Sequence, residues 1–552
     1  MYQDSRESQE RQEATVVRED AGVSIVRRSL IALPRRLVYG YLVYFVLLLV
    51  SFLPYLATDL CYIDESTLLA ESKRILAGEH LHRDFFNFHG IGNYLMVVSL
   101  WRLLGSTDFQ SIKLLTFIVI VAAGVLLTIT TRYFTQRFWL SLLPSLIYCA
   151  YLGHTFPFSN HHWFGSAASI VFCYFFVRYL ESLRLRDMYY CGLAAALSLI
   201  FIMHEGIVTV IAGFTLIVLS LWLVPSAERA SPLRLTATYL AGFATLTVPE
   251  WIYFASIGSF GSFFYNTFVW PLTNYAQPGN LNNRLWADDI QLWGISDAGR
   301  LTGILYFFSI CAIMIVLLLP VLTMLAGAAI LTARASFSSI TRGRDSYLMF
   351  SALMILSLGM YATAVFSQPT LIKLLWASVP ASILAVLLLE WLYTHWRDIA
   401  ARRAFIVLLI FMLMAVAIVP IYRTQKIFRG DESELSGAHT VRPDDPLVEL
   451  INRESTEQDY YFGYKWASPY YYSVKARPAT RYILFVEDYL SREQLQDLFA
   501  DLERHRPKFM TFYEERDILW LISQHAPFSQ FLNNNYRLRT RINNWLVYQR
   551  KN

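Results

Sequence analysis

The densest group of reactive side chains lies in YIDESTLLAESKRILAGEHLHRDFFNFHG, residues 62–90. It places Asp64 and Glu65 side by side and continues with further acids and histidines, among them Asp84 and His89. A carboxylate at a membrane boundary can accept a proton from a hydroxyl or amine nucleophile, and an apolar environment can tune its pKa for that task. A purely structural explanation stays open, because acids cap helices and are favoured in a first helical turn.

Further candidate residues lie at the borders of apolar runs. They are Asn160, His161 and His162 in HTFPFSNHHW, His204 and Glu205 in MHEG, and Lys373 in SQPTLIK. Placing an acid inside the membrane costs free energy, so such residues are usually paired with another group or functional. This favours a functional role for Glu205. Lys373 can bind phosphate as a point charge or merely extend to the membrane surface. His161 and His162 are equally compatible with the aqueous border of a span.

Composition identifies an integral membrane protein. The chain has 552 residues, of which 55% are hydrophobic and 16% charged, whereas soluble domains have roughly 25% charged residues. The net charge of +5 does not indicate a nucleic-acid partner, because the arginines occur in short clusters between apolar runs. The cysteines show no CxxC pair or zinc spacing, so no disulfide framework or cysteine metal site is expected.

The hydropathy pattern predicts a mostly α, polytopic protein with about eleven transmembrane helices. The expected spans lie near residues 38–57, 114–131, 138–153, 163–181, 188–203, 206–224, 235–256, 302–333, 347–366, 371–393 and 404–421. No removable signal peptide is expected in the polar residues 1–26, so the first span would serve as the anchor. The lipid bilayer is therefore an expected partner.

Arginine placement predicts the orientation, because positively charged residues are retained on the cytoplasmic side. Arginine clusters precede the first span and then fall on every second connection. Residues 1–37 are accordingly expected to form a cytoplasmic polar tail. Residues 38–421 form the membrane domain, with an external loop at 58–113, and residues 422–552 lie outside.

The external region 422–552 is expected to be an α/β accessory domain. DPLVELINRE and SREQLQDLFADLERH have helical spacing of apolar residues, whereas DYYFGYKW, KFMTFYEE and NWLVYQR are typical of strands. In the external loop, residues 66–78 are amphipathic. Their pattern predicts a helix lying on the membrane surface, with Glu71, Lys73 and Arg74 on its polar face.

The segment from residue 58 to 105, followed by many spans and an external C-terminal domain, resembles the polyprenyl-phosphate-dependent glycosyltransferases of the GT-C fold. It is most similar to bacterial protein O-mannosyltransferases and lipid A aminoarabinose transferases. The resemblance implies an enzyme of the bacterial inner membrane. It also implies that Asp64 is the base or the acceptor-positioning carboxylate, that Glu65 is the second acid of the pair, and that Asp84 lies in the segment that commonly follows.

This chain departs from the pattern of those relatives in the next external loop, where many have a second acid. Here Asn160, His161 and His162 occupy that loop, and Glu205 is the candidate for the missing carboxylate. The resemblance places Lys373 near the donor phosphate. The expected substrate-binding set is Asp84, His89, His161, His162, His204, Lys373 and Arg83.

The resulting hypothesis is an inverting transfer of a sugar from a polyprenyl-phosphate donor to a lipid, glycan or protein acceptor on the external face. Asp64 would take the acceptor's proton, and the phosphate would meet Lys373 or the basic residues Lys73, Arg74 and Arg83. No cofactor is certain, although a divalent cation among Asp64, Glu65 and the histidines stays open as an alternative.

Two other classes of protein remain open at this point. A polytopic transporter or lipid flippase would also use ionisable groups, but the charged residues within the expected spans are sparse. A membrane-anchored binding or assembly protein would carry its function in the C-terminal domain.

Overall fold

The structure of the chain is a computed structural model. It describes residues 35–57, 63–135, 137–154, 156–223, 230–275, 318–325, 344–367, 371–395, 444–465, 467–483 and 490–551, with the single positions 400, 403 and 441. Most of the expected span 302–333 and all of 404–421 lie outside the described residues. Met1–Ser51 and Phe52–Asn552 form two compact units, and the architecture below concerns the second.

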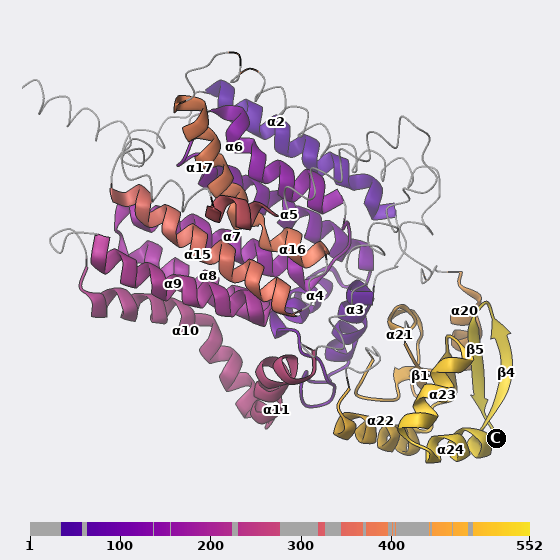
Figure 1. Cartoon of the computed structure of the whole chain (residues 1–552). Coiled ribbons are helices and arrows are strands. Elements are labelled where there is room, and N and C mark those ends of the chain that lie inside the picture. Colours follow the sequence, from indigo (N-terminus) through magenta and orange to yellow (C-terminus); the bar gives the residue numbers. More distant parts are fainter. Residues whose placement is uncertain are drawn as a thin grey trace, which may run out of the picture. The chain divides into compact units, whose positions relative to one another are not determined.

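Helices account for most of the described chain before residue 400 (Figure 1). They are α2 (Arg35–Phe52), η1 (Leu53–Ala57), α3 (Ile63–Leu76), α4 (Ile91–Leu104), α5 (Phe109–Thr131), α6 (Phe138–Ser145), the π-helical η2 (Leu146–Gly153), α7 (His161–Ser182), α8 (Leu185–Phe201), α9 (Met203–Leu223), α10 (Pro232–Ser256), α11 (Phe260–Phe264), η3 (Tyr265–Val269), η4 (Pro271–Tyr275), α15 (Arg344–Ser367), α16 (Leu371–Ala377) and α17 (Val379–His395). The mostly helical class predicted from hydropathy is confirmed.

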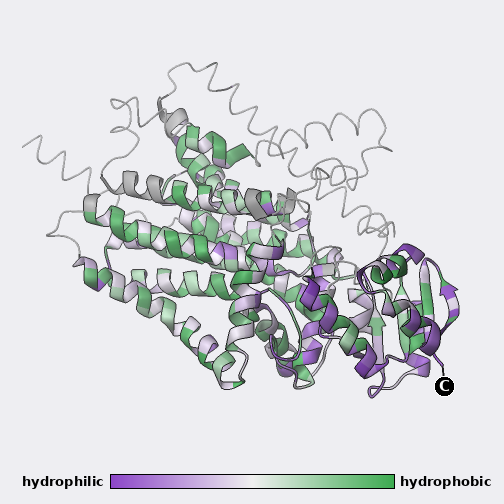
Figure 2. Ribbon diagram, turned by 60° about the horizontal axis from the view of Figure 1, so that its bottom comes forward, coloured by the Kyte–Doolittle hydropathy of each residue, from purple (hydrophilic) through white to green (hydrophobic). Residues whose placement is uncertain are grey.

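Several of these helices are long and apolar enough to cross a bilayer, which makes the chain a membrane protein. Among the described residues they are Arg35–Ala57, Phe109–Thr131, His161–Ser182 and Met203–Leu221. Shorter apolar helices are Ile91–Leu104, Phe138–Ala150, Leu353–Ala364 and Val379–Glu390. Figure 2 shows that the helical part is largely hydrophobic, while hydrophilic residues gather around α3 and in the C-terminal domain. The number eleven stays a prediction.

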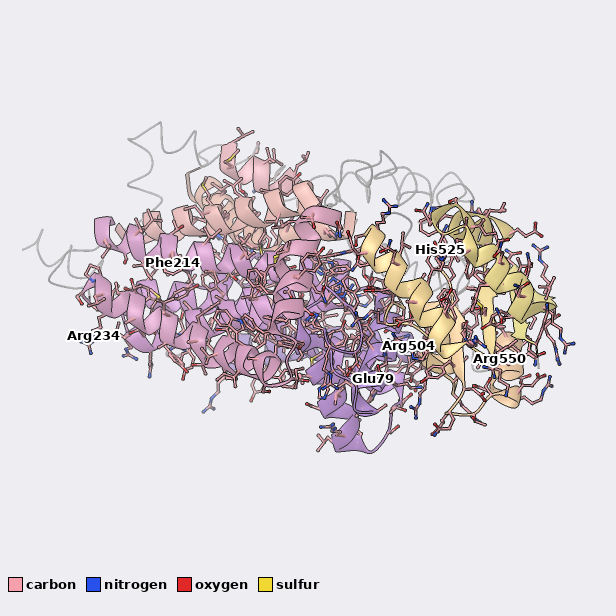
Figure 3. The ribbon with its side chains drawn as sticks, turned by 90° about the horizontal axis from the view of Figure 1, so that it is seen from below. Glu79, Phe214, Arg234, Arg504, His525 and Arg550 are labelled. Atoms are coloured by element: carbon pink, nitrogen blue, oxygen red, sulfur yellow. The ribbon has the colours of Figure 1, made fainter. Side chains whose placement is uncertain are left out.

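One face of α9 is suited to contact with lipid. Ile207, Ile211, Phe214 and Val218 are exposed and recur at helical spacing, so they form one apolar stripe. Figure 3 labels Phe214 on this helix. An exposed stripe of this kind would be unfavourable in water and is stable against acyl chains.

Helix α8 packs against α7, α9 and α10. Its contact with α10 requires two glycines. A Cβ atom at Gly192 would lie 2.0 Å from the Tyr239 carbonyl oxygen, and one at Gly242 would lie 2.0 Å from the Tyr189 carbonyl oxygen. Such small residues let the backbones of two membrane helices approach closely.

The C-terminal domain contains a five-stranded sheet with the order β2-β1-β3-β5-β4. Its strands are β1 (Tyr460–Gly463), β2 (Arg477–Pro478), β3 (Phe509–Phe512), β4 (Tyr536–Ile542) and β5 (Trp545–Arg550). Strand β1 pairs in parallel with β2 and β3, whereas β5 is antiparallel to both of its neighbours. The domain also contains α20 (Pro446–Glu454), α21 (Ser468–Ser473), α22 (Arg492–His505), α23 (Glu515–Gln524) and α24 (Pro527–Asn535).

The helices and strands predicted for this domain are confirmed, whereas its external location stays a prediction. The three expected strands are β1, β3 and β5, and the two expected helices are α20 and α22. Helix α22 begins with a capping box, in which the Ser491 hydroxyl accepts from the Gln494 backbone N–H and the Gln494 side chain accepts from the Ser491 N–H. Strands β2 and β4 were not predicted, because one is two residues long and the other has exposed polar residues along most of its length.

Candidate active site

Asp64 is the second residue of α3, which begins at Ile63. It is therefore not the N-cap, although a carboxylate in the first turn is favoured by the helix dipole. Burial raises the pKa of Asp64 to about 6, and the positive charge of Lys373 opposes that rise. A carboxyl with this pKa is largely ionised at neutral pH and is well matched to accept a proton there.

Glu65 faces a different environment from Asp64. Its Oε1 accepts a hydrogen bond of 2.9 Å from the Ser159 N–H, and its Oε2 lies 3.9 Å from Lys113 Nζ. Glu65 and Lys113 are each 1% exposed. Burial raises the pKa of Glu65, and Lys113 and the Ser159 N–H lower it. These contacts tie the start of α3 to α5 and to the loop before α7, so they favour a positioning role for Glu65.

Four rings from three separate segments form one row. His89, in the loop before α4, stacks on His161 with ring centroids 3.8 Å apart. His161 and His162 open α7, and their ring centroids are 4.2 Å apart. His162 in turn stacks on Trp376 of α16 at 4.4 Å. The structure thus brings together histidines that the sequence separates by more than seventy positions.

Glu205 joins this row from the start of α9. Its Oε1 lies 3.7 Å from His162 Nδ1, and the His204 ring centroid is 6.2 Å from that of His162. Each of His162, His204 and Glu205 offers a ligand atom, and these atoms all lie within 4.8 Å of one another. Glu205 Oε2 and His162 Nδ1 are buried and have no hydrogen-bond partner among the described residues. Two imidazoles and a carboxylate with such unsatisfied atoms fit a divalent transition-metal ion.

Lys373, on α16, lies within electrostatic range of both parts of the site. Its charge acts on Asp64 and on His89, and also on His161, His162 and His204. The structure therefore gathers Asp64, His89, His161, His162, His204, Glu205 and Lys373 into one histidine–carboxylate cluster. Asn160 is adjacent, but its side chain caps α7 by accepting from the Trp163 N–H.

Arg83 and Asp84 do not belong to this cluster. Arg83 donates to both carboxylate oxygens of Asp84 at 2.9 and 2.8 Å, and Asp84 also accepts from the His80 N–H. His80 Nδ1 lies 2.8 Å from the hydroxyl of Tyr253, near the end of α10. Among the described residues, the hydrogen bonds of Arg83 and Asp84 lie within α3, the loop after it and the C-terminal domain, so their predicted binding roles stay predictions.

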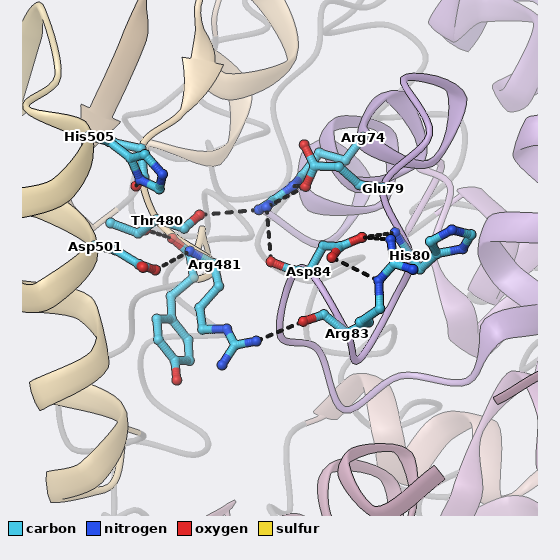
Figure 4. A network of polar contacts seen from close by, with 11 residues as sticks. Arg74, Glu79, His80, Arg83, Asp84, Thr480, Arg481, Asp501 and His505 are labelled. Atoms are coloured by element: carbon cyan, nitrogen blue, oxygen red, sulfur yellow. Dashed lines mark hydrogen bonds and ion pairs between the residues drawn. The ribbon is translucent and has the colours of Figure 1, made fainter. Parts of the chain in front are cut away.

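The C-terminal domain contacts the basic side chains of α3, and Figure 4 shows the contacts of Arg74. Lys73 Nζ donates to the Tyr472 carbonyl at 2.5 Å. Arg74 forms an ion pair of 2.6 Å with Glu79 and donates to the Thr480 carbonyl at 3.2 Å. The prediction that Lys73 and Arg74 meet a donor phosphate is therefore not supported, because both cations are held by other groups.

Further contacts complete what we call the loop–domain interface, between residues 63–107 and residues 470–494. The Phe86 N–H donates to the Arg481 carbonyl, and Arg481 donates to the Arg83 carbonyl. Ala70 of α3 belongs to the same buried cluster as Ile451 and Tyr461 of the C-terminal domain. The expected surface helix is thus corrected: the polar face of α3 is covered by protein, and Arg74 is only 7% exposed.

On α3 itself, a buried carboxyl contacts two further parts of the loop. Glu71 Oε2 accepts from Asn87 Nδ2 at 2.6 Å and from the Tyr94 hydroxyl at 2.7 Å. Glu71 is 1% exposed. Burial raises its pKa to about 8, although both hydrogen bonds and Arg74 act in the opposite direction. Glu71 is therefore mostly protonated at neutral pH.

We expect Glu71→Gln to flatten the pH dependence of stability. Between the ordinary pKa of about 4.5 and the folded value of about 8, the folded state holds a proton that the unfolded state releases. Stability therefore falls as pH rises through this window, by up to about 1.4 kcal/mol per pH unit. Glutamine cannot be protonated or deprotonated in this pH range, so the variant does not show this fall in stability. Thermal unfolding of the purified protein is measured from pH 5 to 9. The stability of the variant relative to the wild type should increase as pH rises, and a constant difference between the two proteins would contradict the prediction.

The fold of this chain resembles that of solved membrane proteins with the GT-C fold. ArnT from Cupriavidus metallidurans bound to undecaprenyl phosphate matches 92% of this chain and 98% of its own, with a TM-score of 0.54 and 14% identity. ArnT from the same organism in the apo state matches with a TM-score of 0.53 and 14% identity, over 93% and 98% of the two chains. No protein-family model matches the sequence, and no curated protein does so either.

Three residues of the site were not predicted from the sequence. Lys113 pairs with Glu65, Trp376 closes the ring row, and Glu71 anchors the loop. Lys113 directly precedes an expected span at 114–131, where a buried cation requires a partner. The position of Lys113 could therefore have predicted its role. The sequence contains no comparable indication for Trp376 or Glu71, because an aromatic residue in an apolar run and an acid on an amphipathic helix are ordinary features.

Proposed function

We propose that this protein is a membrane glycosyltransferase that moves a sugar from a polyprenyl-phosphate donor to an acceptor on the external side of the membrane. The single observation that carries the proposal is the convergence of Asp64, Lys373 and the histidines within this fold. A base with a pKa near neutrality beside a cation suits a reaction that removes a proton and releases a phosphate. That ArnT was solved with undecaprenyl phosphate supports a lipid-phosphate donor.

In the proposed reaction, Asp64 accepts the proton of the acceptor's hydroxyl or amine as that group attacks the anomeric carbon. The new bond forms as the bond between the anomeric carbon and the phosphate oxygen breaks, which inverts the configuration. The lipid phosphate leaves with the bonding electron pair, and its negative charge faces Lys373. The leaving group is already ionised and needs no general acid. The proton ends on Asp64 and then passes to solvent.

A divalent cation is compatible with the histidine–carboxylate cluster. His162, His204 and Glu205 would hold it, because their ligand atoms converge and two of them have no hydrogen-bond partner among the described residues. When bound, it would supply positive charge to a phosphate oxygen. The nearby charge of Lys373 weakens cation binding, so we expect an affinity lower than that of a structural zinc site.

The proposal is tested by identifying the lipid that copurifies and by following its release. Mass spectrometry of the protein extracted from membranes should find a polyprenyl phosphate or its glycosylated form. Addition of a polyprenyl-phosphate sugar with a crude envelope acceptor should then liberate polyprenyl phosphate. A transporter or flippase would move the intact lipid between leaflets of a vesicle without cleaving its sugar.

The mechanism requires the cluster and the C-terminal domain to lie outside the cytoplasm. His80 contacts Tyr253 near the end of α10, whereas Arg234 lies at the start of the same helix, and Figure 3 shows Glu79 and Arg234 well separated. We expect a reporter fused after Asn552 to read as external and one inserted in SITRGRDS, residues 339–346, to read as cytoplasmic. The reverse pattern would remove the acids from the side on which the donor is expected.

A further inference from the structure

A cavity of about 440 Å³ lies where the loop after α3 meets α11, η3 and α22. Its walls include His82, Phe86, Asn266, Tyr482 and Gln494, and we call it the junction cavity. Small-molecule sites occupy roughly 300–1,000 Å³, so it is large enough for a sugar unit. None of its described lining residues belongs to the histidine–carboxylate cluster.

His82 lines the cavity and has a buried ring donor without a partner among the described residues. It is 3% exposed, and the Asn266 amide nitrogen lies 3.3 Å from its Nδ1. An amide nitrogen can only donate, so Nδ1 accepts and the ring proton lies on Nε2. His82 Nε2 has no hydrogen-bond partner among the described residues. A buried donor without a partner costs free energy. The backbone φ of His82 is 65°, which is uncommon for a residue other than glycine.

Two amide side chains add complementary groups. Gln494 Oε1 accepts from Trp270 Nε1 and from the Ser491 N–H, both at 2.9 Å, which fixes the amide through its oxygen. Its NH₂ group donates to no described residue and remains available. Asn266 uses its nitrogen toward His82, so its oxygen remains available as an acceptor. The cavity therefore offers the Gln494 NH₂ group as a donor and the Asn266 oxygen as an acceptor, and a ligand rich in hydroxyl groups can use both.

The charges on the walls disfavour an anionic ligand. Among the described lining residues, Arg481 is the one cation, and its guanidinium lies 3.8 Å from the Asp497 carboxylate. Glu493 adds a second carboxylate. A phosphate or sulfate would meet net negative charge here, which is unfavourable. Phe86 and Tyr482, with ring centroids 5.4 Å apart, instead supply aromatic surface for the C–H face of a sugar ring.

Ring contacts connect the junction cavity to the histidine–carboxylate cluster. Phe86 lies 5.1 Å from Trp270, and Trp270 stacks on Phe88 at 4.9 Å. Phe88 lies 4.5 Å from His89, which stacks on His161. Trp270 is 1% exposed, so this connection is a row of packed rings that holds the two sites in a fixed relation.

We propose that the junction cavity binds an uncharged carbohydrate unit of the acceptor, so that the acceptor is a glycan or a glycan-bearing molecule. The acceptor role rests on the proposed transferase function, whereas carbohydrate binding itself does not. The C-terminal domain supplies part of the wall, through Tyr482 and Gln494, and so takes part in recognition.

Saturation-transfer NMR on the full-length protein in nanodiscs tests the binding. The probes are the methyl glycosides of glucose, galactose, mannose and N-acetylglucosamine, with the peptide Ac-Ala-Ser-Thr-Ala-NH₂ as the alternative class of ligand. We expect at least one glycoside to bind in the millimolar range and to weaken about tenfold or more in Ser262→Trp. Ser262 is an exposed lining residue, so a tryptophan there fills the cavity without disturbing the core.

Ser256→Trp is the matched control, because Ser256 is exposed and outside the lining, and it should bind like the wild type. Gln494→Glu is a second test: it keeps the oxygen that Trp270 and Ser491 donate to and removes the NH₂ donor, so binding should again weaken. Asp64→Asn should bind normally, because Asp64 does not line the cavity. Absence of glycoside binding, or binding unchanged in both cavity variants, would overturn the proposal. Peptide binding lost in Ser262→Trp would assign the cavity to a peptide instead.

Discussion

Asp64→Asn should lower sugar transfer by a factor on the order of 10² to 10⁴, the scale of general-base assistance. Asparagine keeps the size of the side chain and remains acceptable at the start of a helix, so α3 should fold as before. Transfer is measured as release of polyprenyl phosphate, and thermal stability is measured on the same preparation. Unimpaired transfer by a stable variant would disprove the assignment of Asp64 as base.

Two further measurements sharpen this test. Because burial raises the pKa of Asp64 to about 6, the wild-type rate should fall as pH drops through that value, where the carboxylate becomes protonated. Glu65→Gln is the comparison variant. Its carboxylate holds Ser159 and Lys113, so this change should cost stability more than it costs the chemical step. A larger loss of transfer in a stable Glu65→Gln protein would exchange the two roles.

Glu205→Gln should lower transfer by a factor on the order of 10², comparable to the removal of one electrostatic element from an active site. The variant should still accumulate in membranes, because the amide is isosteric and neutral. Metal content is determined alongside by inductively coupled plasma mass spectrometry. If the cation proposal is right, the wild type binds added Mn²⁺ or Zn²⁺ and Glu205→Gln binds either ion more weakly.

A matched control is available on α17. Glu390 is also an acid at the end of a membrane helix, but it accepts from Thr135 and pairs with Arg137, so Glu390→Gln should leave transfer and metal content unchanged. Loss of transfer without a change in metal content would mean that Glu205 acts directly. Unaltered turnover in Glu205→Gln would assign the residue to the structure alone.

Much of the site could be predicted because its members share one property. His161, His162, His204 and Glu205 each directly adjoin an apolar run, and alternating spans are expected to bring such borders to the same side of the membrane. Asp64 likewise lies close behind the first expected span. Hydropathy and the distribution of arginines were therefore enough to predict that these residues share one side of the membrane.

The remaining features depend on contacts between distant segments, which periodicity does not encode. The amphipathic pattern of α3 correctly predicted a helix, but the same pattern fits a polar face covered by water or by another domain. The sequence therefore offers Lys73 and Arg74 as alternatives to Lys373 for the phosphate, whereas in the structure they contact Tyr472 and Thr480. Asn160 likewise resembled a ligand in sequence and serves as a helix cap.

The loop–domain interface has a consequence for how the protein is made. Lys73 and its partner Tyr472 are 399 positions apart, and chains grow at roughly 5–20 residues per second, so α3 waits on the order of 20 to 80 seconds for the groups that cover its polar face. During that interval Lys73 and Arg74 have no C-terminal domain to contact. The polar face of the helix that bears Asp64 is therefore covered only when synthesis is almost complete, whereas its contacts with Asn87, Tyr94 and Lys113 can form much earlier.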